Sequence, residues 1–147
     1  MIPGRGFLFH GHNDVLETAI VEPMEKFLLI SIGAALGANA RFWLGDWAAR
    51  RWGTGFPYGT FLINVSGSLV LGLFLALATE RFLVDPRWRL LFAVGFLGAY
   101  TTFSTFSYES YTLFARGQWG LGALNVLGST LVGLVGVALG MYLGKAL

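Results

Sequence analysis

Four long apolar segments occupy most of this chain of 147 residues and constrain its fold more than any other feature. They run over residues 27–44, 59–79, 90–114 and 121–143, and the second and fourth contain no charged residue. A helix of about 20 apolar residues spans the hydrocarbon core of a bilayer. Because backbone groups in lipid must satisfy their own hydrogen bonds, each segment is predicted to be a helix. The sequence therefore predicts an all-α membrane protein with four transmembrane helices.

The composition narrows the classes of function. The chain is 55% hydrophobic and only 12% charged, whereas soluble domains carry about 25% charged residues. It has no cysteine, which excludes disulfides and thiolate metal sites. The apolar segments hold no histidine and no paired carboxylates, so an enzyme is the least favoured class. The basic residues lie near the segment ends, where they are predicted to anchor helices rather than to bind nucleic acid.

Residues 1–23 differ from the rest of the chain because they are polar and contain several glycines, Pro3 and Pro23. One interpretation is a disordered extension. The other is that Met24 is the natural start, because it leads almost directly into the first apolar segment. Residues 24–147 are expected to form a single four-helix membrane domain.

The third apolar segment is interrupted by polar residues between Gly95 and Glu109. Five serine and threonine hydroxyls, two glycines and one carboxylate fall there. Glycine and repeated threonine weaken a helix, so a break is predicted near Gly98–Thr102. Carbonyl groups freed by a break need an ion, water or protein partner, and in broken membrane helices they commonly hold Na⁺. The alternative is an unbroken helix whose hydroxyls bond to its own carbonyls, and composition alone leaves both open.

Aromatic and polar side chains around this interruption are candidates for an ion pathway. Phe103 and Phe106 share a helix face, and the positive edge of an aromatic ring can favour an anion. Ser104, Thr105 and Asn64 offer hydrogen-bond donors that could replace the water around such an anion. Two phenylalanines in a membrane helix more often contact lipid or core, so the spacing suggests a pathway without naming the ion.

Asn64 belongs to a polar stripe in which Thr60, Asn64 and Ser68 recur every four residues. Its amide could form hydrogen bonds between two helices, or it could supply an N–H donor to an ion pathway. The stripe alone favours neither interpretation clearly. Glu109 is expected toward the mouth of the pathway. Arg41 could snorkel to the headgroups, which its spacing favours, or line a vestibule that attracts anions.

Small residues recur every four positions in the first and fourth segments and are predicted to let helices approach closely. They include Gly33, Gly37, Gly136, Gly140 and Gly144. Asn125 and Ser129 form a second polar stripe in the fourth segment.

Basic residues are nearly balanced across the membrane. From Met24 onward one side would hold five of them and the other side four. Positive charge normally accumulates on the cytoplasmic side. The balance fits a chain that inserts in both directions and pairs head to tail, or one with a weakly biased single orientation.

Three motifs, taken in this order, resemble the Fluc (CrcB) family of fluoride channels. They are residues 33–41, residues 59–67, and residues 95–107 followed by Glu109; the third reads GFLGAYTTFSTFS. The match covers residue 24 to the C-terminus. The family often has two adjacent glycines before the threonines, whereas here the second is Ala99, and Tyr100 follows where an apolar residue is usual. Either change could tighten the break.

The resemblance implies an antiparallel, dual-topology homodimer with two fluoride pores, each lined by both chains. It implies a multi-pass protein of the bacterial inner membrane that exports fluoride passively and so reduces its toxicity. A structural Na⁺ at the dimer centre would be held by the backbone carbonyls of Gly98 and Thr101. The pore residues and those near the pore ends would be Asn64, Phe103, Phe106, Ser104, Thr105, Thr60, Ser129, Glu109 and Arg41.

Two other classes of protein share four spans and balanced charge. A small dual-topology, proton-coupled exporter needs a carboxylate embedded in the membrane, and Glu109 lies late in its segment. A structural membrane subunit would use the glycine stripes to associate. It would not need the amide of Asn64, the threonine pair and the phenylalanine pair together.

Overall fold

The computed structural model describes residues 10–78 and 85–147, and for residues 10–21 it describes the helical backbone alone. The elements are α1 (His10–Trp52), α2 (Tyr58–Ala76), α3 (Pro86–Trp88), the π-helix η2 (Arg89–Leu97), α4 (Gly98–Tyr100), α5 (Phe103–Ala115) and α6 (Trp119–Ala146). Four stretches are long and apolar enough to cross a membrane, namely Glu22–Trp52, Tyr58–Ala76, Pro86–Ala115 and Trp119–Ala146. The predicted all-α class with four transmembrane helices is confirmed.

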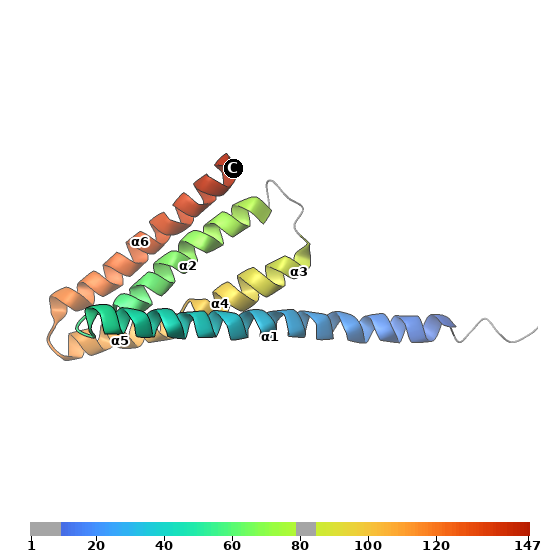
Figure 1. Cartoon of the computed structure of the whole chain (residues 1–147), viewed down its shortest axis with the longest axis horizontal. Coiled ribbons are helices and arrows are strands. Elements are labelled where there is room, and N and C mark those ends of the chain that lie inside the picture. The colour runs from blue at the N-terminus through green and yellow to red at the C-terminus, as the bar shows by residue number, and fades with distance from the viewer. Residues whose placement is uncertain (1–9, 79–84) are drawn as a thin grey trace, which may run out of the picture.

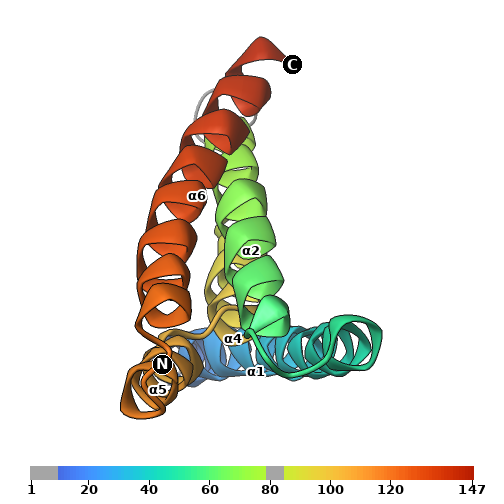
Figure 2. The ribbon, with the colours of Figure 1, turned by 90° about the vertical axis from the view of Figure 1, so that its left-hand side faces the viewer.

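Two pairs of helices make up most of the fold. α2 and α6 lie side by side, and α1 runs along η2 and α4 (Figures 1 and 2). α5 continues the third span beyond the break and packs against α6. The N-terminal end of α1 projects past the other helices (Figure 1).

Glycines allow both pairs to approach closely. A Cβ atom on Gly140 of α6 would clash with the carbonyl oxygen of Leu69 on α2. A Cβ atom on Gly37 of α1 would clash with the carbonyl oxygen of Phe96 on η2, and one on Gly33 would clash with that of Leu91. The interpretation of these glycines as packing positions is confirmed. Because glycine has no side chain, the backbones of the two helices come into direct contact at these positions.

The first helix is longer than the sequence predicted. Its expected end was residue 44, but α1 continues to Trp52. An ion pair between Asp46 and Arg50, four residues apart, supports this last part. Gly53 then ends the helix in a left-handed conformation, with φ of 76°. At the other end, residues 1–9 of the predicted extension lie outside the described residues, and α1 begins at His10.

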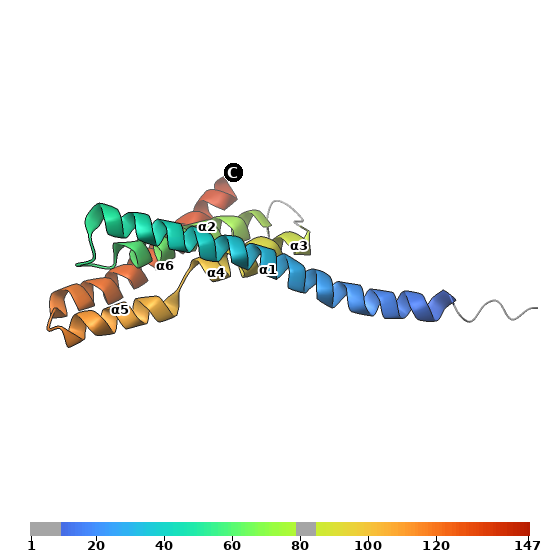
Figure 3. The ribbon, with the colours of Figure 1, turned by 60° about the horizontal axis from the view of Figure 1, so that its bottom comes forward.

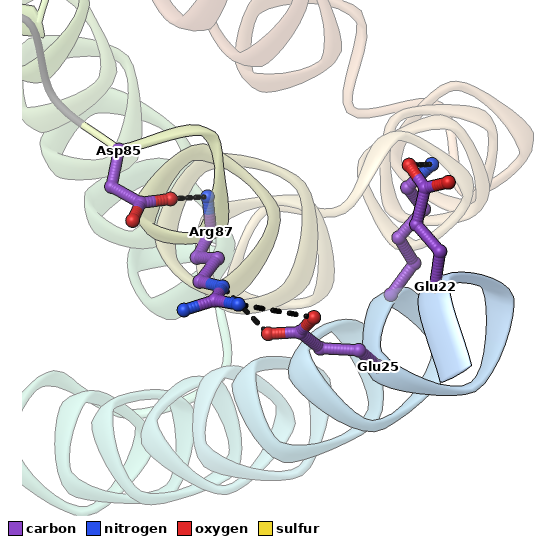
Figure 4. A network of polar contacts seen from close by, with 5 residues as sticks. Glu22, Glu25, Asp85 and Arg87 are labelled. Carbon is purple, nitrogen blue, oxygen red and sulfur yellow. Dashed lines mark hydrogen bonds and ion pairs between the residues drawn. The ribbon is translucent and has the colours of Figure 1, made fainter. Parts of the chain in front are cut away.

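A cluster of charged side chains joins the start of the first span to the start of the third. Arg87 Nε lies 2.6 Å from Glu25 Oε1, and its Nη2 lies 3.3 Å from Glu25 Oε2. The backbone N–H of Arg87 donates to Asp85, which caps α3. Figure 4 shows Arg87 between the carboxylates of Asp85 and Glu25, with Glu22 nearer the N-terminal end of α1. This ion pair joins α1 to α3.

The third span is broken at Thr101 and Thr102, as the sequence predicted. Thr101 has φ of −76° and ψ of 156°, and Thr102 has φ of −148° and ψ of 116°. Both residues therefore have an extended backbone conformation. Figure 3 shows the chain running between α4 and α5 without a helical turn. The alternative of an unbroken helix is therefore wrong. Hydroxyls nevertheless bond to their own helix, since Thr101 Oγ1 donates to the carbonyl of Leu97 at 3.0 Å.

Candidate functional site

The break is stabilised by a side-chain amide from the neighbouring helix. Asn64 Nδ2 on α2 donates to the carbonyl oxygen of Thr102 at 3.1 Å. The backbone N–H of Thr102 donates to Asn64 Oδ1 at 2.9 Å. The amide therefore satisfies both backbone groups of a residue that has left the helix. Asn64 joins two helices, and the second hydrogen of its Nδ2 atom is not used by this pairing.

Thr102 also starts the second half of the span. Its Oγ1 accepts from the backbone N–H of Thr105 at 3.4 Å, which makes Thr102 the N-cap of α5. The same Oγ1 donates to Thr105 Oγ1 at 3.0 Å. Thr105 Oγ1 accepts in that bond, so its own hydroxyl hydrogen stays available.

The break leaves the backbone carbonyls of residues 98–101 without the N–H partners that they would have in a continuous helix. In a continuous helix the carbonyl of Gly98 would accept from Thr102 N–H, and that of Thr101 would accept from Thr105 N–H. Both N–H groups donate elsewhere, to Asn64 and to the Thr102 hydroxyl. Gly98 is exposed and Thr101 is half-buried. These two carbonyls are the pair expected to hold Na⁺, and oxygen donors suit such a hard cation.

A groove of about 320 Å³ lies beside the break. Five of the predicted site residues line it, namely Asn64, Gly98, Thr101, Phe103 and Phe106. The rings of Phe103 and Phe106 lie 5.9 Å apart between centroids, at 43° to each other. Phe103 is 80% exposed, so it forms an open wall of the groove.

A second hollow, of about 700 Å³, also borders the break and is called the vestibule here. Its lining includes four further predicted residues, Arg41, Thr60, Thr105 and Glu109. Arg41 lines this hollow, and its role in attracting anions stays a prediction. Arg116, at the end of α5, also lines it. Thr102 lines both the groove and the vestibule, so both hollows border the break.

Glu109 carries a buried oxygen that needs an explanation. Its Oε2 atom has no hydrogen-bond partner among the described residues. Thr60, which is 7% exposed, lies beside the same carboxylate. An unpartnered carboxylate oxygen at the wall of a hollow is most easily satisfied by water within it.

Ser104 and Ser129 are not among the residues that line either hollow. Ser104 is exposed on α5. Ser129 Oγ donates to Asn125 Oδ1 at 3.3 Å, and Asn125 Nδ2 donates to Ser110 Oγ at 2.8 Å. Ser110 Oγ donates in turn to the carbonyl oxygen of Phe106 at 2.7 Å. Ser129 is therefore part of a buried chain of hydrogen bonds that ends at Phe106.

Sequence reasoning missed Ser110 and the role of Thr102. Thr102 and Thr105 have the spacing of an N-cap and its third residue, which is a local signal for a helix start. Ser110 lies four residues after Phe106, the spacing at which a hydroxyl reaches its own helix carbonyl. Its contact with Asn125 has no local signal, because α5 and α6 must first meet.

The polar groups at the break are of the kinds that bind small ions. No group of three or more His, Cys, Asp or Glu side chains is placed to hold a metal within the described ranges. The available groups are carbonyl oxygens for a cation, and amide hydrogens, hydroxyl hydrogens and ring edges for an anion.

Comparisons with known proteins show the family of this chain. Residues 28–141 match the family model of the CrcB-like protein, Camphor Resistance (CrcB). A protein of Koribacter versatilis (strain Ellin345), named fluoride-specific ion channel FluC, is 53% identical over 114 residues, which are 78% of this chain and 90% of that protein. A protein of Roseiflexus sp. (strain RS-1) with the same name is 48% identical over 122 residues, 83% of this chain and 98% of that protein. The chain therefore belongs to the CrcB family, as do these relatives named FluC.

Proposed function

We propose that this chain is a fluoride-selective channel through which fluoride leaves the cytoplasm passively. The observation that carries the proposal is that the groove and the vestibule both border Thr102, in a chain whose relatives are named fluoride-specific ion channels. The membrane potential supplies about 2.3 kcal/mol per charge for each 100 mV. An anion inside a negative cell is driven outward by this potential without any coupled reaction.

Unused donors support an anion on this route. The second amide hydrogen of Asn64 faces no partner in the Thr102 pairing, and Asn64 lines the groove. The hydroxyl hydrogen of Thr105 is likewise unused in its bond with Thr102, and Thr105 lines the vestibule. Fluoride is small and strongly hydrated, so a narrow route needs such donors to replace its water. Neutral donors bind it weakly enough for release.

Phe103 and Phe106 are proposed to carry fluoride between these donors. Their rings present edges at different angles, because their planes are inclined at 43°. A ring edge attracts an anion without the full charge that would hold it in place.

A second copy of the chain, inserted in the opposite direction, is proposed to close each pore. Phe103 and Gly98 are exposed although they line the groove, and a groove open on one side cannot keep fluoride from lipid. Tyr108 and Tyr111 of α5 are 71% and 70% exposed. An antiparallel homodimer would cover this surface and give two pores.

Na⁺ is proposed as the cofactor at the break. The carbonyls of Gly98 and Thr101 would hold it, since both have lost their helical N–H partners. When bound, Na⁺ would supply a fixed positive charge near the groove. The exposure of Gly98 is consistent with a position at the surface where two copies meet.

A proton-coupled exporter is the second candidate, because Glu109 has a buried oxygen without a partner. Fluoride efflux from liposomes separates the two. We expect purified protein to release fluoride, measured with an electrode, with no proton gradient and with little chloride release. Efflux that requires a proton gradient would favour the exporter. A folded protein that releases no fluoride under either condition would contradict the channel.

A further inference from the structure

Tyr100, the last residue before the break, is hydrogen-bonded to the neighbouring helix. Its Oη atom lies 2.8 Å from Ser66 Oγ on α2. Ser66 Oγ donates to the carbonyl oxygen of Leu62 at 2.6 Å. Because this uses the only hydroxyl hydrogen of Ser66, Tyr100 is the donor and Ser66 the acceptor in the bond between them.

The ring of Tyr100 is held from two sides. It stacks on Phe96 with 5.9 Å between centroids and 9° between planes, and Phe96 stacks on Phe92 at 5.4 Å and 3°. On the α2 side, a Cβ atom on Gly67 would lie 3.3 Å from Tyr100 Cδ1. Since the ring is fixed by stacking and by close backbone contact, its hydroxyl has a defined direction toward Ser66.

Two contacts with α2 therefore enclose the break. Tyr100 bonds to Ser66 before it, and Thr102 bonds to Asn64 after it. Thr101 lies between these two anchored residues. Its carbonyl and that of Gly98, one turn earlier, can point in a fixed direction only if both flanking segments keep their orientation.

We propose that Tyr100 is a positioning residue that acts through Ser66 to fix the backbone of the break and the direction of the Gly98 and Thr101 carbonyls. The link from these carbonyls to Na⁺ rests on the proposed function, whereas the backbone role does not.

The first test is amide hydrogen exchange of the full-length protein over residues 98–106. Loss of one hydrogen bond should speed exchange there about two- to tenfold in Tyr100→Phe. Ser66→Ala should give a similar increase, and the double variant should exceed neither single variant. Tyr142→Phe is the control, because Tyr142 is 70% exposed on α6. Unchanged exchange in both Tyr100→Phe and Ser66→Ala would overturn the proposal.

The second readout is the Na⁺ concentration that gives half-maximal fluoride efflux from liposomes. In Tyr100→Phe it should rise about two- to tenfold, with the maximal rate largely kept. A lower maximal rate at an unchanged Na⁺ concentration would contradict a positioning role toward the carbonyls. A wild type that releases no fluoride would contradict the proposed function alone, since the exchange measurement needs neither fluoride nor Na⁺ transport.

Discussion

Asn64 and Thr102 lie 38 residues apart in the sequence and pair through both polar groups of one amide. The pairing resembles the contact between two adjacent strands, except that a side chain provides one partner. It satisfies the backbone groups of Thr102 where the helix of the third span is interrupted, and so fixes an extended conformation there. The direction of the chain into α5, and hence the position of Phe103 and Phe106, depends on it.

Asn64→Asp should therefore damage both the break and the transport. The carboxylate replaces the Nδ2 donor and brings an oxygen against the carbonyl oxygen of Thr102. We expect fluoride efflux to fall at least about tenfold and the free energy of unfolding to fall by about 1–3 kcal/mol. Efflux from liposomes and thermal unfolding in detergent measure the two effects.

Ser68→Ala is the matched control for Asn64→Asp. Ser68 lies one turn further along the same stripe and lines the same groove, but it does not bond to Thr102. Its variant should keep wild-type unfolding. If Asn64→Asp behaved like Ser68→Ala in both measurements, the amide would have no special role at the break.

Phe106→Ile should slow fluoride efflux while leaving the fold intact. Isoleucine keeps apolar volume but has no positive ring edge to attract an anion. An aromatic contact of about 0.5–1.5 kcal/mol corresponds to a loss of about two- to tenfold in rate. Phe27→Ile is the control, since Phe27 is 65% exposed on α1. Equal efflux from the two variants would remove Phe106 from the pathway.

The spans could be predicted from the sequence because hydropathy is a local property. A run such as residues 121–143, without a charge, has few alternatives to a membrane helix. The end of the first helix was less predictable. Charge and aromatic content alone predict a loop over the segment that contains Asp46, Arg50 and Trp52. The ion pair between Asp46 and Arg50 supports helix there, and the helix ends only at Gly53.

The break could not be decided from composition, because a hydroxyl can bond to its own helix or leave it. Thr101 bonds to its own helix, whereas Thr102 caps the next one. The difference comes from Asn64, which reaches Thr102 only once α2 and the third span are adjacent. Ser129 shows the same limit, since its bond to Asn125 removes it from the two hollows.

Gly67→Ala should disturb the break from the α2 side. The added Cβ would clash with Thr101 Cγ2 and lie 3.3 Å from the ring of Tyr100. Because both neighbours are held by other contacts, we expect a cost of about 1–3 kcal/mol in unfolding free energy. Gly128→Ala should be nearly neutral, since its Cβ would meet Leu124 and Phe61 at an ordinary 3.8 Å. Thermal unfolding of both variants checks this, and equal stability would show that Thr101 can move without cost.

Asn125→Leu tests the buried chain of hydrogen bonds that ends at Phe106. Asn125 is fully buried, and its amide joins Ser110 on α5 to Ser129 on α6. Leucine has no polar group, so the Ser129 hydroxyl hydrogen loses its acceptor in a buried position. We expect unfolding free energy to fall by about 1–3 kcal/mol.

Thr130→Ala serves as the control for Asn125→Leu, because Thr130 is exposed and its hydroxyl donates within its own helix, to the carbonyl of Val126. Its variant should unfold like the wild type. Ser110→Ala should lower stability as Asn125→Leu does, and the double variant should lose less than the sum, since both changes remove the same contact. Additive losses would mean that Asn125 and Ser110 stabilise the fold independently, and the chain from Ser129 to Phe106 would not act as a unit.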